Sequence, residues 1–260
     1  MPTGISVQGK PIAGGKFPLI CTPLTGKTRE AVLAEVVAIL PKRPDVIEWR
    51  VDFFEAIAAA GEVVALAGAI KERAGGTPVI FTRRSAGEGG QRVALTEGEV
   101  VELYERICAS KTVDLVDYEL SNTAESLRRV REASRQSGVG LIGSYHNFQF
   151  TPSPEAIRDR FLAAEGLGAD VAKVAVMPRS AEDVLILLVA TLRGRREVRI
   201  PIISMSMGPY GSLTRMFGFA FGSVLTFAVG HSSSAPGQVP IEDLRSVLEI
   251  AQRALGDAQL

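Results

Sequence analysis

The feature that most constrains this 260-residue chain is a regular alternation of short apolar segments with longer amphipathic ones. A run typical of a buried parallel strand is followed, about eight times, by apolar residues at helical spacing. The expected strands cover residues 17–24, 45–52, 77–83, 114–120, 140–148, 170–177, 200–207 and 224–229. The expected helices, caps included, cover residues 28–40, 62–74, 96–109, 122–137, 154–167, 180–195, 213–222 and 241–255. Eight such units in about 250 residues predict an α/β fold, a single (β/α)8 TIM barrel spanning residues 1–260.

A doubly wound open sheet would show the same alternation, so it is the alternative fold. No Gly-x-Gly-x-x-Gly fingerprint follows the first strand, which disfavours it. Before the first unit, residues 4–15 have the pattern of a short hairpin with a turn at Gly9 and Lys10. We expect residues 1–15 to form an N-terminal β-hairpin that closes the bottom of the barrel.

Composition excludes several classes of protein. Hydrophobic residues make up 46% of the chain, enough for a large core. The 29 basic and 29 acidic side chains balance, which argues against a nucleic-acid or membrane surface as the main partner. Two distant cysteines, Cys21 and Cys108, do not make a disulfide framework. We see no secretory signal and no run of about 18 apolar residues, so we expect a cytoplasmic protein.

Lys173 interrupts the valine-rich strand expected at 170–177. Burial disfavours the charged form of a lysine. A partly neutral lysine is a nucleophile toward carbonyl groups, as in enzymes that form a Schiff base. The alternative is that Lys173 pairs with an acid from another strand or reaches the rim of the barrel.

Several other expected strands carry polar residues at a spacing of two, which places their side chains on one face. They are Glu48, Arg50 and Asp52, then Asp117 and Glu119, while the strand at 77–83 ends in Arg83 and is followed by Arg84. In this fold, polar residues at the C-terminal ends of strands indicate an active site. The alternative is a structural layer of ion pairs, because buried charges must be paired. Met205 and Met207 share a face in the same way, and methionines there mainly form wall or core.

His146 lies near the end of the strand that precedes the Lys173 strand. Neighbouring barrel strands lie about 5 Å apart, so both side chains can reach one small substrate. A lone histidine can be purely structural. A lysine that forms an imine beside a histidine suited to proton transfer near neutral pH is, however, a working catalytic pair.

Three loops after strands add candidate ligand contacts. The glycine-rich segment 85–90 carries Glu88, and Arg215 follows the turn after the seventh strand, where it can bind a carboxylate with two hydrogen bonds. The segment 233–238 offers Ser234, Gln238 and main-chain N–H groups, which could also bind phosphate. No metal site is expected, because the two histidines are far apart and no Cys-x-x-Cys or His-Glu-x-x-His occurs.

Together these motifs resemble those of the type I 3-dehydroquinate dehydratases, Schiff-base enzymes of the shikimate pathway. The resemblance extends from about residue 18 to residue 238 and rests on six motifs in order. They are Glu48-Trp-Arg-Val-Asp52, Thr82-Arg-Arg-Ser-Ala-Gly-Glu-Gly-Gly90, Ser144-Tyr-His-Asn-Phe148, Ala169-Asp-Val-Ala-Lys-Val-Ala-Val-Met-Pro178, Met205-Ser-Met207 with Arg215, and Ser234-Ala-Pro-Gly-Gln238. The ordered set is far more specific than any single motif.

The resemblance implies a hydro-lyase that converts 3-dehydroquinate to 3-dehydroshikimate by syn dehydration, on the route to chorismate and the aromatic amino acids. Lys173 would form the imine, His146 would be the general acid and base, and Glu88 would orient and polarise His146. Arg215 would hold the substrate carboxylate. The other expected substrate-binding residues are Glu48, Arg50, Arg84, Ser234, Gln238, Met205 and Phe227. The resemblance further implies no cofactor, no metal and a homodimer.

Two positions depart from the family pattern. Asn147 replaces an acid, which we expect to alter the pKa of His146 slightly, and Pro23 replaces a serine, so that one contact is expected to be lost. His231 has no motif role and is expected to be a loop residue.

Two other functions stay open. One is an aldolase-type lysine-imine enzyme acting on a sugar phosphate, which would need a phosphate site. The other is a metabolite-binding barrel without catalysis, which the joint presence of Lys173 and His146 disfavours.

Overall fold

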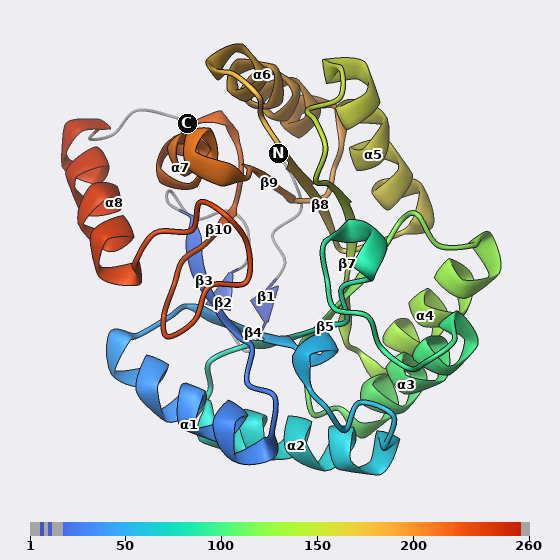
Figure 1. The fold of residues 1–260 in the computed structure, drawn as a ribbon. Coiled ribbons are helices and arrows are strands. Elements are labelled where there is room, and N and C mark those ends of the chain that lie inside the picture. The colour runs from blue at the N-terminus through green and yellow to red at the C-terminus, as the bar shows by residue number, and fades with distance from the viewer. Residues whose placement is uncertain (1–5, 8–9, 12–17, 256–260) are drawn as a thin grey trace.

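The computed structural model describes residues 6–7, 10–11 and 18–255. Within them, eight parallel strands form a barrel that eight α-helices surround (Figure 1). The barrel strands are β3 (Leu19–Leu24), β4 (Val46–Arg50), β5 (Val79–Thr82), β6 (Leu115–Glu119), β7 (Gly140–Asn147), β8 (Val171–Val176), β9 (Ile202–Ser206) and β10 (Leu225–Phe227). The helices are α1 (Arg29–Ile39), α2 (Ala60–Arg73), α3 (Glu97–Ser110), α4 (Ala124–Ser137), α5 (Pro154–Leu167), α6 (Ala181–Glu197), α7 (Gly208–Phe217) and α8 (Ile241–Leu255). Four 3-10 turns are η1 (Leu40–Lys42), η2 (Val51–Phe53), η3 (Ala86–Glu88) and η4 (Gly218–Phe221).

The strand order settles the choice between barrel and open sheet. The strands pair in the order β10-β3-β4-β5-β6-β7-β8-β9, so successive strands are neighbours throughout. The two ends of this order meet where Ile202 bridges Ser223 in parallel and its carbonyl accepts the N–H of Val224 at 2.9 Å. A doubly wound sheet would reverse its strand order in the middle, so the predicted barrel is confirmed.

The N-terminal hairpin is described only in part. The short strands β1 (Ser6–Val7) and β2 (Lys10–Pro11) pair antiparallel. The rest of the segment 1–15 lies outside the described residues. Its closing of the barrel bottom therefore stays a prediction.

Most helix ends lie where the sequence places them. Thr96 and Glu99 form a capping box at the start of α3, and Pro154 begins α5. The predicted cap of α4 is wrong by one residue, because Thr123 and not Asn122 accepts the N–H of Ser126.

Helix α7 begins earlier than predicted. The segment 208–211, expected as a turn, is its first turn, which tolerates Pro209 because N–H groups there have no partner within the helix. Gly211 packs against the carbonyl of Ser206, where a Cβ atom would come within 2.2 Å. This close contact seats α7 against the end of β9.

The barrel interior changes from apolar to polar along the strands. Each of Val46, Leu115, Ile142 and Val171 lies in a buried apolar cluster inside the barrel. Two residues further along the same strands, and therefore on the same face, stand Glu48, Asp117, Ser144 and Lys173. An apolar floor thus supports a polar layer near the C-terminal ends of the strands.

Two expectations from the composition concern the cysteines and membrane-spanning segments. Cys21 and Cys108 are buried free thiols. No helix among residues 18–255 is long and apolar enough to span a membrane.

Candidate active site

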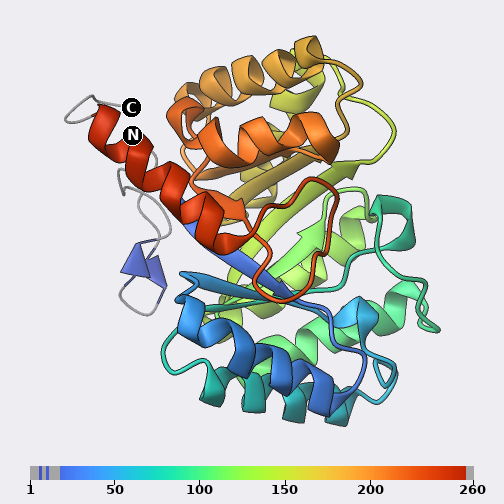
Figure 2. The same ribbon diagram turned by 60° about the vertical axis from the view of Figure 1, so that its left-hand side comes forward.

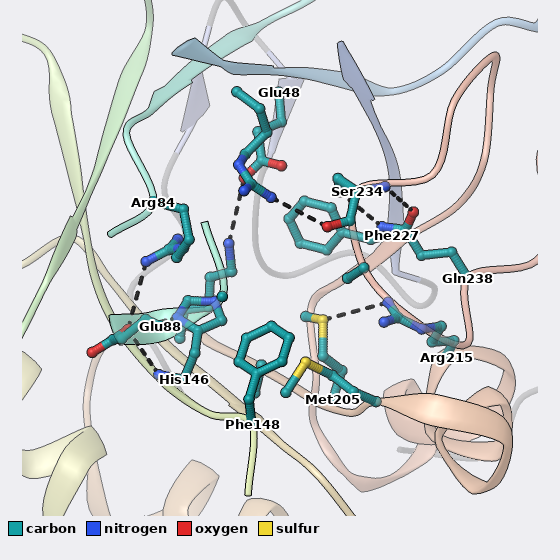
Figure 3. A pocket seen from close by; sticks show the side chains of 16 residues that line it. Glu48, Arg84, Glu88, His146, Phe148, Met205, Arg215, Phe227, Ser234 and Gln238 are labelled. Carbon is teal, nitrogen blue, oxygen red and sulfur yellow. Dashed lines mark hydrogen bonds and ion pairs between the residues drawn. The ribbon is translucent and has the colours of Figure 1, made fainter. Parts of the chain in front are cut away.

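A pocket of about 420 Å³, its mouth included, opens at the C-terminal ends of the strands (Figure 3). It brings together all eleven residues predicted for the site. Its lining residues are Glu48, Arg50, Arg84, Glu88, Gly89, His146, Phe148, Lys173, Ala175, Met205, Met207, Arg215, Phe227, Ser234, Ala235 and Gln238. They come from five strands and from the segments that follow strands, which is the usual place for an active site in this fold.

Lys173 is 4% exposed and projects from the middle of β8. Its Nζ donates to Asp117 Oδ2 at 2.7 Å and lies 3.5 Å from Glu48 Oε1. It also lies 4.6 Å from the centre of the Phe227 ring. The alternative in which Lys173 pairs with acids from other strands is therefore correct. It does not compete with a catalytic role, because Lys173 also lines the pocket.

A layer of ion pairs surrounds this lysine, as the structural alternative predicted. Arg84 is 2.7 Å from Asp117 and 3.0 Å from Glu119. Arg50 holds both oxygens of Asp52 at 2.8 Å, although Asp52 lies in η2 and not in the predicted strand. The layer fixes three cations whose side chains also form pocket walls.

Local turns place Glu88 against His146. Ser85 caps η3 by accepting the N–H of Glu88, and Gly89 ends it at a φ of 85°, which favours glycine. A Cβ on Gly89 would come within 2.2 Å of the Phe148 ring. Glu88 is therefore presented from a compact turn that a larger residue at 89 would displace.

The Glu88 carboxylate contacts His146 at two points. Oε2 accepts the main-chain N–H of His146 at 2.9 Å and lies 2.9 Å from Nδ1, while Ser121 donates to Oε1 at 2.7 Å. An acceptor at Nδ1 favours the tautomer with the proton on that nitrogen, which leaves a lone pair on Nε2. Burial, and then the charges of Arg84 and Lys173, hold the pKa of His146 well below its usual value. The imidazole is thus neutral and can accept a proton.

The pKa of Glu88 is raised to about 7, first by burial and then by the charge of Glu119. Because Glu88 Oε2 lies 2.9 Å from His146 Nδ1, a proton gained by either group changes the hydrogen bond between them.

Strand register sets the offset between the backbone positions of Lys173 and His146. Ser144 lies beside Lys173, and His146 lies beside Ala175, two residues further along β8. That step is roughly 7 Å at 3.3 Å per residue. The imidazole therefore stands beyond the backbone level of the lysine and toward the ends of the strands.

Arg215 is the cation of this pocket without a carboxylate partner among the described residues. It is 1% exposed, and its guanidinium donates to Met205 Sδ at 3.5 Å and to the carbonyl of Pro236 at 3.2 Å. Its Nε is buried without a hydrogen bond. Burial lowers the pKa of Arg215 to about 10. Figure 3 shows Arg215 and Met205 across the pocket from His146 and Glu88.

The loop between β10 and α8 supplies Ser234 and Gln238 and extends over the strands at one side of the barrel (Figures 1 and 2). Gln238 accepts the N–H of Ser234 at 3.0 Å and donates to its hydroxyl at 3.2 Å. Arg50 donates to the carbonyl of Ser234 at 3.4 Å, and Gly208 donates to that of Pro236 at 3.2 Å. These bonds hold the loop against the pocket.

Some lining residues received no role from the sequence. Phe148 shares the face of His146 at a spacing of two, a signal that could have identified it. Ala175 stands two residues after Lys173 and could have been found in the same way. Gly89 and Ala235 line the pocket through loop conformations that no sequence period reveals.

The departures noted in the sequence lie outside the pocket lining. The Asn147 oxygen accepts the N–H groups of Gln149 and Phe150, so it caps the turn after β7. Its effect on the pKa of His146 stays a prediction. Pro23 does not line the pocket. His231 is an exposed loop residue, as expected. Within residues 18–255, no group of three or more His, Cys, Asp or Glu side chains could hold a metal ion.

Comparison with known proteins shows which family the chain belongs to. The family model for type I 3-dehydroquinase matches residues 20–254. This chain belongs to the type I 3-dehydroquinase family. The resemblance seen in the six motifs is confirmed.

Relatives in the family are similar over almost their whole length. The 3-dehydroquinate dehydratase of Albidiferax ferrireducens is 58% identical over 255 residues, which cover 98% of this chain and 97% of that protein. The crystal structure of 3-dehydroquinate dehydratase from Geobacillus kaustophilus has a TM-score of 0.95 and 48% identity, and covers 97% of both chains. The type I enzyme from Clostridium difficile, solved with covalently modified comenic acid, has a TM-score of 0.93 and 35% identity, over 97% of this chain and 99% of that one. A 3-hexulose-6-phosphate synthase, at 16% identity and a TM-score of 0.59, shares the fold alone.

Proposed function

We propose that this chain is a hydro-lyase that dehydrates 3-dehydroquinate to 3-dehydroshikimate through an imine on Lys173. The observation that carries the proposal is the arrangement of three groups around one pocket. They are the buried amine of Lys173, the neutral imidazole of His146 and the guanidinium of Arg215, which has no carboxylate partner among the described residues. The relatives named 3-dehydroquinate dehydratase support this substrate.

The first step joins Lys173 to the substrate ketone. An ammonium and a ketone lose one water to give a protonated imine, so the nitrogen carries one positive charge before and after. Two N–H hydrogens and the ketone oxygen leave as that water. The charge needs no new partner, because Asp117 already accepts a hydrogen bond from the same nitrogen.

The second step uses the protonated imine as an electron sink. His146 Nε2 removes a proton from the carbon next to the imine, and the electron pair moves into the C=N bond to give an enamine. The imidazolium then gives that proton to the hydroxyl one carbon further on. The enamine then expels the protonated hydroxyl as water, which leaves a conjugated imine. Hydrolysis of this imine releases the product and the free lysine. One base serving both transfers implies syn elimination.

The remaining pocket residues suit a polar carbocycle with one carboxylate. Arg215 can pair with the carboxylate, which supplies the counter-charge that this buried cation lacks. Glu48, Arg50, Arg84, Ser234 and Gln238 offer donors and acceptors for ring hydroxyls. Met205 and Phe227 form an apolar wall for the ring.

We propose further that the enzyme is a cytoplasmic homodimer, as the family resemblance implies. In support, the neighbouring helices α6 and α7 expose five large apolar side chains to solvent. They are Leu185, Val189, Tyr210, Leu213 and Phe217, each between 38% and 60% exposed. A patch of this kind marks an interaction surface more often than it occurs on a monomer.

Turnover of 3-dehydroquinate tests the proposed reaction directly. The conjugated enone product absorbs in the ultraviolet, whereas aldol cleavage would form no such enone. We expect wild type to produce the absorbance and Lys173→Ala to lose it. Lys71→Ala is the matched control, since Lys71 also pairs with an acid, Asp114, but lies outside the pocket. Near-normal turnover by Lys173→Ala would refute the mechanism.

A further inference from the structure

Asp117 contacts the amine of Lys173 from outside the pocket lining. Its side chain is completely buried, and it does not line the pocket. Its Oδ2 nevertheless accepts a hydrogen bond from Lys173 Nζ at 2.7 Å. Asp117 can therefore act on the nitrogen but cannot bind the substrate.

The second oxygen of Asp117 is held by the polar layer. Oδ1 accepts from the hydroxyl of Ser144 at 2.6 Å and from Arg84 Nη2 at 2.7 Å. Burial favours the neutral acid, but the charges of Arg84 and Lys173 outweigh it and hold the pKa of Asp117 well below its usual range. The carboxylate is thus ionised, rigid and aimed at Nζ.

Glu48, the other acid near the amine, is placed differently. Its Oε1 is 3.5 Å from Nζ and accepts from the Thr82 hydroxyl at 3.0 Å. It also lines the pocket, so it can turn to a substrate hydroxyl. Asp117, at 2.7 Å, lies closer to Nζ than Glu48 does, and it approaches from outside the pocket lining.

From this geometry we propose that Asp117 is the counter-ion that keeps the imine on Lys173 protonated during dehydration. The inference rests on the proposed imine. Of the three N–H bonds of the ammonium, one remains in the protonated imine, and Asp117 accepts it from the side away from the substrate. A neutral imine would withdraw too few electrons for His146 to remove a carbon-bound proton. Asp117 is therefore a positioning residue that preserves the electron sink.

The consequence is a specific dependence on pH. An opposite charge within about 4–6 Å favours the charged form by roughly one to three pKa units. The loss of Asp117 should let the imine lose its proton at lower pH. The other ionisable groups around Lys173 are Glu48 from β4, His146 from β7, Arg84 after β5 and the Cys21 thiol of β3. All four remain when Asp117 alone is changed.

The test compares two isosteric variants by the pH profile of kcat, which reports groups in the substrate complex. In Asp117→Asn the alkaline limb should move to lower pH by about one to three units. Glu119→Gln is the matched control, because Glu119 belongs to the same layer and contacts Arg84 and Ser85 but not Lys173. Its alkaline limb should stay in place. The proposal would be overturned if the alkaline limb of Asp117→Asn stayed in place, or if both variants shifted it equally.

A second measurement needs no variant and so does not depend on the folding of Asp117→Asn. The probe is 3-oxocyclohexane-1-carboxylate, a keto acid without the departing hydroxyl, labelled with carbon-13 at the ketone. We expect the Raman C=N stretch of its imine to shift on exchange into D2O at neutral pH, because the imine carries an N–H. An imine whose C=N stretch does not shift in D2O would contradict the proposed role of Asp117.

Borohydride trapping separates this inference from the proposed function. A trapped adduct in wild type together with an unmoved alkaline limb in Asp117→Asn would refute the counter-ion alone. The absence of any adduct in wild type would refute the imine itself.

Discussion

Glu88 Oε2 accepts the main-chain N–H of His146 at 2.9 Å and lies equally close, 2.9 Å, to its Nδ1. This double contact fixes the ring and its tautomer together. A proton added to the pair resides on the imidazole, or on Glu88 facing Nδ1, and in both cases Nε2 becomes N–H. One added proton therefore removes the Nε2 lone pair that the proposed base needs.

The first prediction is an acid limb set by this pair. Because the pKa of Glu88 is raised to about 7, kcat/KM should fall as the pH drops through about 7. In Glu88→Gln only the imidazole titrates, and its pKa is lowered by burial and by Arg84 and Lys173. The acid limb should therefore move to lower pH while the maximal rate falls, since an amide orients Nδ1 less firmly. Rate profiles across pH measure both effects, and an acid limb that stays in place would show that the pair is not what titrates.

The second prediction concerns Arg215, which is buried without a carboxylate partner among the described residues. Arg215→Met should stabilise the free protein by about 0.5–2 kcal/mol, because an isolated buried charge is removed. It should weaken substrate binding by about 2–5 kcal/mol, roughly 30-fold or more in KM. Urea unfolding and initial rates give the two quantities.

Arg50→Met is the control for the stability half of this prediction. Arg50 is also buried but is paired with both oxygens of Asp52, so its removal leaves a buried carboxylate unpaired and should cost roughly 3 kcal/mol. Equal destabilisation by both changes would mean that Arg215 is already neutralised in the free protein.

The third prediction concerns the apolar surface on α6 and α7. Leu213→Glu places a charge among these exposed apolar side chains and should shift the protein from dimer to monomer in sedimentation or light scattering. Val37→Glu is the control, since Val37 is 60% exposed on α1, away from these helices. If the wild-type protein is monomeric at all concentrations, the proposed dimer is refuted.

The barrel could be predicted because apolar residues recur at strand spacing in the strands and at helical spacing in the helices. Strands that follow one another in the chain are also neighbours in the barrel. Six of the eleven predicted site residues lie on strands, where the spacing along the strand fixes the face of each side chain. The other five lie in segments that follow strands, and these segments meet at the same end of the barrel. The partner of Lys173 could not be predicted, because Asp117 is 56 residues away and the pairing depends on strand register. The early start of α7 was missed because Gly208 and Pro209 are typical of turns, and only the packing of Gly211 on β9 shows that they begin a helix.

The most direct measurement is borohydride reduction in the presence of 3-dehydroquinate, followed by mass spectrometry of the digested protein. We predict one irreversible adduct, located on Lys173, in wild type and also in His146→Ala, whose kcat should fall by about 10²–10⁴-fold. Lys173→Ala should show none. An adduct on another residue, or a Lys173→Ala protein that still turns over substrate, would contradict the account.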